Sequence, residues 1–136
     1  MLELLAPAGN LDAVIAAVQN GADAVYMGFG DGFNARRSAD NFTRESFAKA
    51  VRYCHIRGCK VYVTLNTLVG DREMDAAAAL AQQASDAGAD AILVQDLGLA
   101  RVLRAALPDI PLHASTQMSI HNLAGVEAAA EMGITR

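Results

Sequence analysis

Two residues near the carboxyl end of the chain, His113 and Ser115, could do chemistry together. A serine with a histidine beside it is the pairing of a nucleophile and its general base, so both are candidate catalytic residues. In a strand, however, they would point to the same side about 6.6 Å apart, too far for direct proton transfer. The glycines of a nucleophile elbow are also missing around Ser115. We therefore expect His113, Ser115 and Gln117 mainly to line a polar substrate pocket.

Other polar residues follow short apolar runs of the sequence. Asn66 and Gln95 each come directly after such a run, where a carboxamide can bind a polar substrate or be satisfied by water and loop backbone. A longer loop carries Asn34, Arg36 and Arg37. Its two guanidinium groups could hold a carboxylate or phosphate in a bidentate manner, or they could be solvated surface groups. We include all five residues among the candidates for substrate binding.

The sequence predicts no metal site and no cofactor within these residues. The histidines lie in unrelated surroundings, and no histidine–glutamate spacing typical of a zinc-binding helix is present. Cys54 and Cys59 have four residues between them, and no further thiols lie nearby. Because free buried cysteine behaves as a small hydrophobe, we expect both to be reduced and structural.

The composition is typical of a globular protein with a buried sheet. Of the 136 residues, 53% are hydrophobic and 19% are charged, and the net charge is -4. This acidic balance argues against a nucleic-acid clamp that works by phosphate neutralisation, and it allows only a local basic spot. No apolar stretch approaches the ~20 residues that cross a bilayer, and residues 1–5 do not resemble a signal peptide. We therefore expect a cytoplasmic protein without membrane contact.

A repeated phrase indicates the elements that must position the candidate residues. The sequence Gly-Ala-Asp-Ala begins at Gly21 and again at Gly88, each time after an alanine-rich stretch and before a short apolar run. Glycine can end a helix in the left-handed conformation, and the aspartate can bind backbone amides before a strand begins. Looser copies occur at Gly58 and Gly133. The phrase thus predicts a recurring joint from helix to strand.

Apolar runs and amphipathic stretches alternate along the whole chain. We predict strands at residues 3–5, 24–28, 60–66, 91–95 and 112–115, a further strand starting at Ile134, and helices at residues 11–20, 44–57, 72–87, 98–107 and 123–132. The expected helix caps are Asn10, Thr43, Asp71 and Asp96, with Ser119 or Asn122 for the last helix. Apolar runs without alternation favour a parallel sheet that is covered on both faces.

Two architectures compete for this α/β pattern, an open doubly wound sheet and an eight-fold barrel. Because the units are nearly identical and no dinucleotide fingerprint follows the first strand, we predict a partial TIM-like barrel. Residues 1–136 would form its N-terminal part, with about five βα units, truncated before the barrel closes. Chemistry is then expected at the carboxyl ends of the strands, whereas Asp23 and Asp90 belong to the opposite, stabilising face. The open sheet edge is expected to favour self-association.

Six phrases in this order resemble the N-terminal half of the collagenase-like peptidases of family U32, whose catalytic type is unassigned. The phrases are ELLAPAG (3–9), GADAVY (21–26), FNAR (33–36), KVYVTLNT (60–67), VQDLG (94–98) and HASTQ (113–117). The resemblance implies a TIM-like barrel at the start of a longer protein. The family-matching residues expected to line the substrate side are Asn34, Arg36, Asn66, Gln95, Ser115 and Gln117.

The family implies two alternative functions. The first is proteolysis of collagen-like or other peptides, with this segment inactive alone. The second is oxygen-independent hydroxylation of RNA bases or of a quinone precursor, with an iron–sulphur cluster in the full-length protein. The cluster cysteines of the family lie beyond residue 136, and Cys54 and Cys59 do not match them. The partner would accordingly be a peptide or an RNA, bound by the full-length protein.

Overall fold

A computed structural model describes residues 2–35 and 41–136 and shows helices and strands in alternation. Arg36 and Arg37 lie outside the described residues. The strands are β1 (Leu5–Pro7), β2 (Ala24–Met27), β3 (Lys60–Leu65), β4 (Ala91–Val94) and β5 (Leu112–Ala114). The helices are α1 (Leu11–Gln19), α2 (Arg44–His55), α3 (Met74–Asp86), α4 (Leu97–Ala106) and α5 (Leu123–Glu131), with short 3-10 turns η1 (Asp71–Glu73) and η2 (Thr116–Met118).

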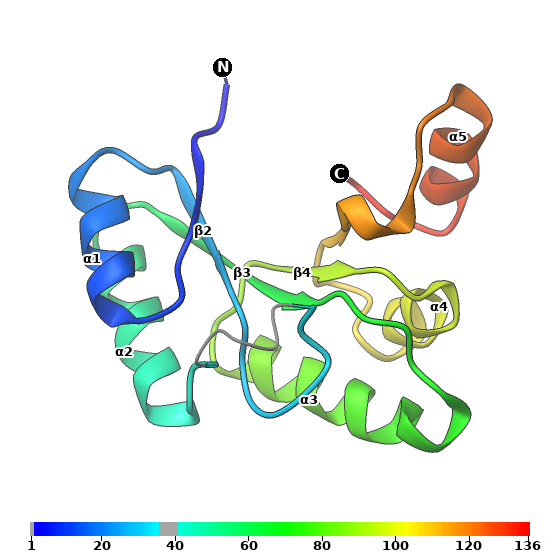
Figure 1. Cartoon of the computed structure of the whole chain (residues 1–136), viewed down its shortest axis with the longest axis horizontal. Coiled ribbons are helices and arrows are strands. Elements are labelled where there is room, and N and C mark those ends of the chain that lie inside the picture. Colours follow the sequence, from blue (N-terminus) through cyan, green and yellow to red (C-terminus); the bar gives the residue numbers. More distant parts are fainter. Residues whose placement is uncertain (1, 36–40) are drawn as a thin grey trace.

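The five strands form one parallel sheet in the order β1-β2-β3-β4-β5, so every strand pairs with its neighbours in sequence. Such an order, without a reversal, is that of a barrel rather than of a doubly wound sheet. The sheet does not close. At its far side Ile134 forms an isolated parallel bridge with Leu112, at the position where a further strand is predicted. Helices α1 to α4 follow one another around the sheet, and both chain ends lie on the side that they leave uncovered (Figure 1).

The two faces of the sheet differ in what covers them. The outer face packs against the helices and is almost completely buried, as at Val25, Val63 and Ile92. The inner face carries the side chains in between, including Tyr62, whose cluster with Ala24 and Ala91 is smaller. Helices therefore cover the outer face, and the inner face carries this second, smaller buried cluster. None of the helices in the described part of the chain has the length and apolarity needed to cross a bilayer.

The repeated joint has the same geometry in both copies. Gly21 and Gly88 have φ values of 89° and 98°, which favour glycine. The Asp23 carboxylate accepts a hydrogen bond of 2.7 Å from the amide of Leu4, whose carbonyl accepts one of 2.9 Å from the Asp23 amide. The second copy repeats this exchange between Asp90 and Val61, at 2.7 Å in each direction. The aspartates thus bind backbone amides as predicted, but these amides belong to the neighbouring chain segment.

Most predicted helix caps are confirmed. The side chains of Asn10, Thr43, Asp96 and Asn122 each accept a hydrogen bond from the amide three residues further on. The prediction for Asp71 is wrong, because the chain enters α3 through η1, where the Gly70 amide donates to the Glu73 carboxylate at 2.9 Å. Strand β1 begins two residues later than predicted, since the Leu4 amide bonds to the Asp23 side chain.

Candidate functional site

A cavity of about 360 Å³ lies over the inner face of the sheet. Apolar and aromatic side chains from the strands form part of its wall. The polar side chains that line it are Tyr26, Thr64, Asn66, His113, Ser115, Thr116, Gln117 and Arg136. A volume of this size falls within the range of about 300–1,000 Å³ that is typical of small-molecule sites. We call this space the inner-face cavity.

Asn66 connects two parts of the rim of this cavity. It directly follows β3, and its side-chain oxygen accepts a hydrogen bond of 3.1 Å from the amide of Ala35 in the loop after β2. Its amide nitrogen donates at 3.4 Å to the hydroxyl of Ser115 after β5. The carboxamide therefore links the loop to the end of the fifth strand, across a separation that no local sequence pattern reveals.

Ser115 is only 6% exposed, and its side chain caps η2. Its hydroxyl accepts a hydrogen bond of 3.3 Å from the Gln117 amide at the start of η2, in addition to the one from Asn66. Its described contacts include no imidazole. Instead, the His113 ring lies edge-on against the Tyr62 ring, with the ring centroids 4.8 Å apart. The structure thus gives these two residues separate surroundings instead of a nucleophile–base pair.

His113 faces the cavity as a neutral group. Burial lowers the pKa of its imidazole, and the nearby positive charge of Arg136 lowers it further. The ordinary pKa of histidine is about 6.5, so at neutral pH the ring is uncharged. A neutral imidazole offers one hydrogen-bond donor and one acceptor, which suits the recognition of a polar heterocycle.

The two glutamines complete the rim. The Gln95 side chain donates at 3.4 Å to the carbonyl of Gln117, which places these residues side by side at the ends of β4 and β5. The Gln117 side chain is exposed at the cavity mouth. Asn34 is placed differently, because its side-chain amide donates a hydrogen bond of 2.9 Å to the side-chain oxygen of Asn41. Both side chains pack against Gly28, where an added Cβ atom would lie 2.0 Å from the Asn41 oxygen. The sequence-predicted residues Asn66, Gln95, Ser115 and Gln117 thus come together, whereas Asn34 fastens the base of its loop.

Sequence analysis did not predict a charged cluster that adjoins the inner-face cavity and contributes Arg136 to its lining. The Tyr62 hydroxyl lies 3.0 and 3.1 Å from the two carboxylate oxygens of Glu3, to which it donates. The Arg136 guanidinium forms an ion pair with the same carboxylate and lies 5.9 Å from the centroid of the Tyr62 ring. The one sequence signal for this cluster is the strand alternation in residues 60–65, which places Tyr62 on the same face as Thr64. We call Glu3, Tyr62 and Arg136 the floor cluster.

The electrostatics of the floor cluster favour its charged form. The hydrogen bond from Arg136 lowers the pKa of Glu3, although partial burial acts in the opposite direction. Burial raises the pKa of Tyr62 to about 12, and its hydrogen bond to Glu3 adds to this effect. The hydrogen bond to Glu3 also raises the pKa of Arg136. At neutral pH the cluster is therefore an ion pair with a neutral tyrosine.

The two cysteines do not fit the ligand set of an iron–sulphur cluster. Cys54 and Cys59 are buried near the amino end of β3, at the end of the sheet opposite the rim. Burial raises the pKa of Cys54 to about 12 and also raises the pKa of Cys59, whereas cluster ligands are thiolates. Within residues 2–35 and 41–136 no three metal-binding side chains are grouped. No step of chemistry is therefore assigned to these thiols.

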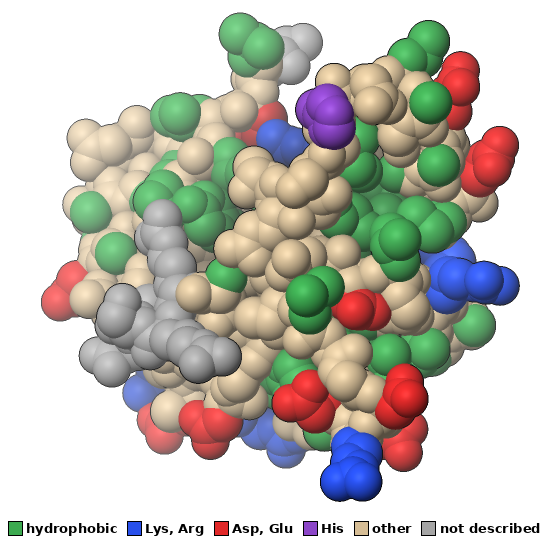
Figure 2. Space-filling view, turned by 45° about the vertical axis from the view of Figure 1, so that its right-hand side comes forward, with side chains coloured by type: hydrophobic (Ala, Val, Ile, Leu, Met, Phe, Trp, Pro, Cys, Tyr) green, Lys and Arg blue, Asp and Glu red, His purple; other side chains and the backbone are tan. Residues whose placement is uncertain are grey.

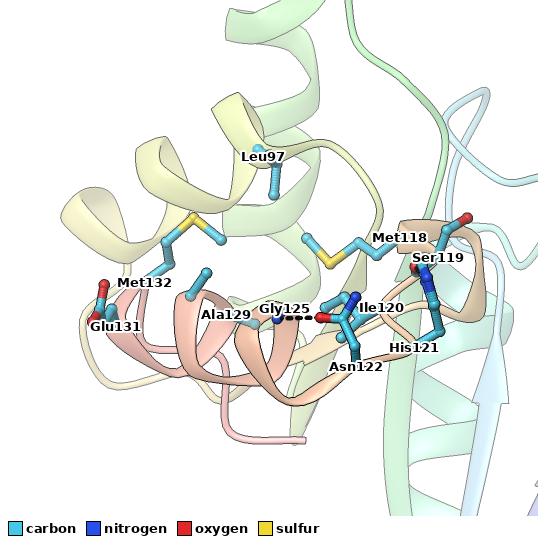
Figure 3. Close-up of a pocket in the computed structure, with 11 residues that line it drawn as sticks. Leu97, Met118, Ser119, Ile120, His121, Asn122, Gly125, Ala129, Glu131 and Met132 are labelled. Atoms are coloured by element: carbon cyan, nitrogen blue, oxygen red, sulfur yellow. Dashed lines mark hydrogen bonds between the residues drawn. The ribbon is translucent and has the colours of Figure 1, made fainter.

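A second hollow, of about 500 Å³, lies between α4 and α5. Met118 and Met132 enter it from opposite sides, and Leu97 lies across from them (Figure 3). Asn122 at its edge is engaged as the cap of α5 through Gly125. Figure 2 shows hydrophobic side chains gathered on this side of the molecule. The hollow is mainly apolar, although Ser119, His121 and Glu131 also line it.

With this geometry in place, comparison with known proteins identifies the family. Residues 9–136 match Peptidase family U32. The chain belongs to this family. The resemblance proposed from the six sequence phrases is thus confirmed.

Relatives within the family carry two kinds of name. The 23S rRNA 5-hydroxycytidine C2501 synthase of Escherichia coli K12 is 40% identical over 99% of this chain and 20% of its own length. The tRNA hydroxylation protein P1 of Bacillus subtilis 168 is 39% identical over 98% of this chain and 32% of its own length. A collagenase of Porphyromonas gingivalis W83 is 36% identical over 88% of this chain and 28% of its own length. The chain thus spans a fifth to a third of the length of these relatives.

Solved structures confirm the fold. A U32 peptidase matches 98% of this chain and 56% of its own chain, with a TM-score of 0.79 and 17% identity. The dihydrodipicolinate synthase of Agrobacterium tumefaciens C58 covers 97% of this chain and 52% of its own, with a TM-score of 0.61 and 20% identity. The open sheet is therefore a TIM-barrel-like arrangement of five parallel βα units.

Proposed function

We propose that this chain is the N-terminal barrel portion of an enzyme that hydroxylates bases in RNA. The observation that carries this proposal is the 40% and 39% identity to proteins named for rRNA and tRNA hydroxylation. The collagenase-named relative, at 36%, gives weaker support for proteolysis. Hydroxylation, the alternative to proteolysis, is thus the function that the relatives favour.

The inner-face cavity agrees with this proposal. Carboxamides from Asn66 and Gln117 and the neutral imidazole of His113 both donate and accept hydrogen bonds, as the edge of a nucleobase requires. Enzymes that modify a base commonly take it out of the stack and into a pocket. Proteolysis would need an activated nucleophile, but the described hydrogen bonds of Ser115 hold its hydroxyl as a cap.

We further propose that any iron–sulphur cluster of the full-length protein is held by residues outside this chain. Cys54 and Cys59 are buried, and burial raises the pKa of both thiols. Their position near the amino end of β3 also separates them from the rim of the inner-face cavity. The 136 residues would then supply binding and orientation of the base, while the redox chemistry comes from elsewhere in the protein.

The test is to express the whole gene in an Escherichia coli K12 strain that lacks its 23S rRNA 5-hydroxycytidine synthase and its tRNA hydroxylation proteins. Ribosomal and transfer RNA are digested to nucleosides, and hydroxylated pyrimidines are measured by mass spectrometry. We expect a hydroxylated nucleoside that is absent from the strain with an empty vector. Unchanged RNA, together with gelatin hydrolysis by the purified full-length protein, would instead identify a peptidase.

A further inference from the structure

The hydrogen bonds around Ser115, at the rim of the inner-face cavity, all run in one direction. The backbone amide of Ala35 can only donate, so the Asn66 atom that lies 3.1 Å from it is the side-chain oxygen. The other end of this carboxamide is therefore the amino group, which donates at 3.4 Å to the Ser115 hydroxyl. The backbone amide of Gln117 donates to the same hydroxyl at 3.3 Å. Ser115 is thus the acceptor in both of these hydrogen bonds.

The proton of the Ser115 hydroxyl is the part of this group that remains to be used. A serine hydroxyl has one O–H donor and two acceptor lone pairs, and here both acceptor positions are taken. Within residues 2–35 and 41–136, no protein group accepts the proton. Ser115 is 6% exposed and lines the inner-face cavity. Because a buried donor without a partner is unfavourable, an acceptor atom on a ligand in this cavity would complete the arrangement.

The two accepted hydrogen bonds also change the chemistry of the hydroxyl. Each N–H group draws electron density from the serine oxygen, and hydrogen bonds linked in this way strengthen one another. The O–H group is therefore a stronger donor than that of an isolated serine. The lone pairs that a nucleophile needs are engaged, and the described contacts of Ser115 include no general base. The arrangement favours donation of a hydrogen bond over attack on a substrate.

We infer that the Ser115 hydroxyl donates a hydrogen bond to an acceptor atom of the base bound in the inner-face cavity, and that Asn66 orients this hydroxyl. The inference rests on the proposed function, which makes the ligand a nucleobase. Each of the four bases presents a carbonyl oxygen or a ring nitrogen that can accept. Ser115 therefore sets the orientation of the base and does not select which base is bound. For cytosine, an acceptor atom faces Ser115 and the amino group points away from it.

The substitution Asn66→Asp tests this inference because it redirects the Ser115 proton. The carboxylate keeps an oxygen for the Ala35 amide, but it replaces the amino group that donates to Ser115 by a second acceptor. Ser115 then donates to this carboxylate, and its proton is no longer available to a ligand. The variant retains Ser115 and the size of the substituted side chain, whereas Ser115→Ala removes the hydroxyl and with it the cap of η2.

Binding of cytidine and of uridine to the full-length protein that carries this chain is measured by isothermal titration. We expect Ser115→Ala and Asn66→Asp each to weaken the binding of the tighter nucleoside about ten-fold, as the loss of one hydrogen bond does. In the Ser115→Ala background, Asn66→Asp should have no further effect, because the proton that it captures is already absent. Ser85→Ala in α3 and Asn20→Asp at the end of α1 lie outside the cavity and are the matched controls. Circular dichroism and thermal unfolding establish that all variants are folded.

A chemical probe distinguishes a donor from a nucleophile at the same residue. Fluorophosphonates react with activated serine nucleophiles, so the full-length protein is treated with one, digested and analysed by mass spectrometry. We expect Ser115 to remain unlabelled. A labelled Ser115 would overturn the inference and would favour a hydrolase.

Three binding results would also overturn the inference. These are no binding of either nucleoside to the wild-type protein, wild-type affinity of a folded Ser115→Ala variant, and an equal effect of Asn66→Asp with and without Ser115. The last result would trace the effect of Asn66→Asp to its added charge. If RNA is hydroxylated in the cell but Ser115→Ala binds nucleosides normally, the inference fails and the proposed function stands. If binding depends on Ser115 and Asn66 as expected but no RNA is modified, the function fails and the inference stands.

Discussion

Glu3 and Arg136 are 133 residues apart in sequence and form an ion pair on the inner face of the sheet. Glu3 precedes the first strand, and Arg136 follows the bridge from Ile134 to β5. Tyr62 on the central strand β3 donates to the same carboxylate. The two edges of the open sheet are thus linked through its middle by one polar cluster.

Removing the charge of Glu3 should lower stability. Glu3→Gln keeps the size of the side chain but loses charge-assisted hydrogen bonds, for which we expect a loss of about 1–2 kcal/mol in the free energy of unfolding. Urea unfolding measures this loss. Glu127→Gln, at an exposed position of α5, is the control and should leave the free energy unchanged. An equal effect of both substitutions would show that the ion pair contributes nothing.

The same pair predicts a pH dependence. Because the hydrogen bond from Arg136 lowers the pKa of Glu3 in the folded protein, its stabilisation is present above the unfolded pKa and is lost as the pH falls through the folded pKa. The ordinary pKa of glutamate is about 4.3. Wild-type protein should therefore lose its stability advantage over Glu3→Gln below about pH 4. A difference that stays constant from about pH 7 to about pH 3 would contradict this linkage.

The repeated aspartates should stabilise the fold through the backbone amides that they bind. Asp90→Ala leaves the Val61 amide without its side-chain acceptor and should cost about 1–3 kcal/mol, whereas Asp90→Asn keeps an acceptor oxygen and should cost less. Asp109→Ala, at an exposed position in the turn before β5, serves as the control. Thermal unfolding ranks the three variants, and we expect Asp90→Ala to be the least stable. If one of the other two variants were the least stable, the proposed role of this hydrogen bond would be refuted.

The cysteines should be unreactive in the folded protein. Burial raises the pKa of Cys54 to about 12, and alkylation requires the thiolate. Iodoacetamide at about pH 8 should label Cys54 and Cys59 only after denaturation, as mass spectrometry can establish. Rapid labelling of the native protein would show that these thiols are accessible and would reopen their role as ligands.

We also propose that the 136-residue chain associates with itself. Strands β1 and β5 are the edges of an open sheet, and large apolar residues are exposed, including Leu4 before β1 at 56% and Leu123 in α5 at 71%. Such surface favours pairing between copies. Light scattering at increasing concentration should show a rising mass. A constant monomer mass at millimolar concentration would contradict the proposal.

The fold could be predicted from local sequence, whereas half of the site could not. The joints at Gly21 and Gly88 and the caps at Asn10 and Asn122 depend on residues close in sequence, so short patterns reveal them. The rim could be predicted because the carboxyl ends of parallel strands meet at one edge. The floor cluster depends on Glu3 meeting Arg136 across the sheet, and no local pattern encodes that contact.

The most direct test of the central claim is the amount of hydroxylated pyrimidine nucleoside in RNA from the complemented Escherichia coli strain, with and without the rim carboxamide of Asn66. The wild-type gene should restore the modification, and Asn66→Ala should reduce it at least ten-fold at equal protein level, because the loop and β5 lose their link. Asn20→Ala, at the exposed end of α1, should behave as wild type. RNA that stays unmodified with the wild-type gene would contradict the claim that this protein is an RNA hydroxylase.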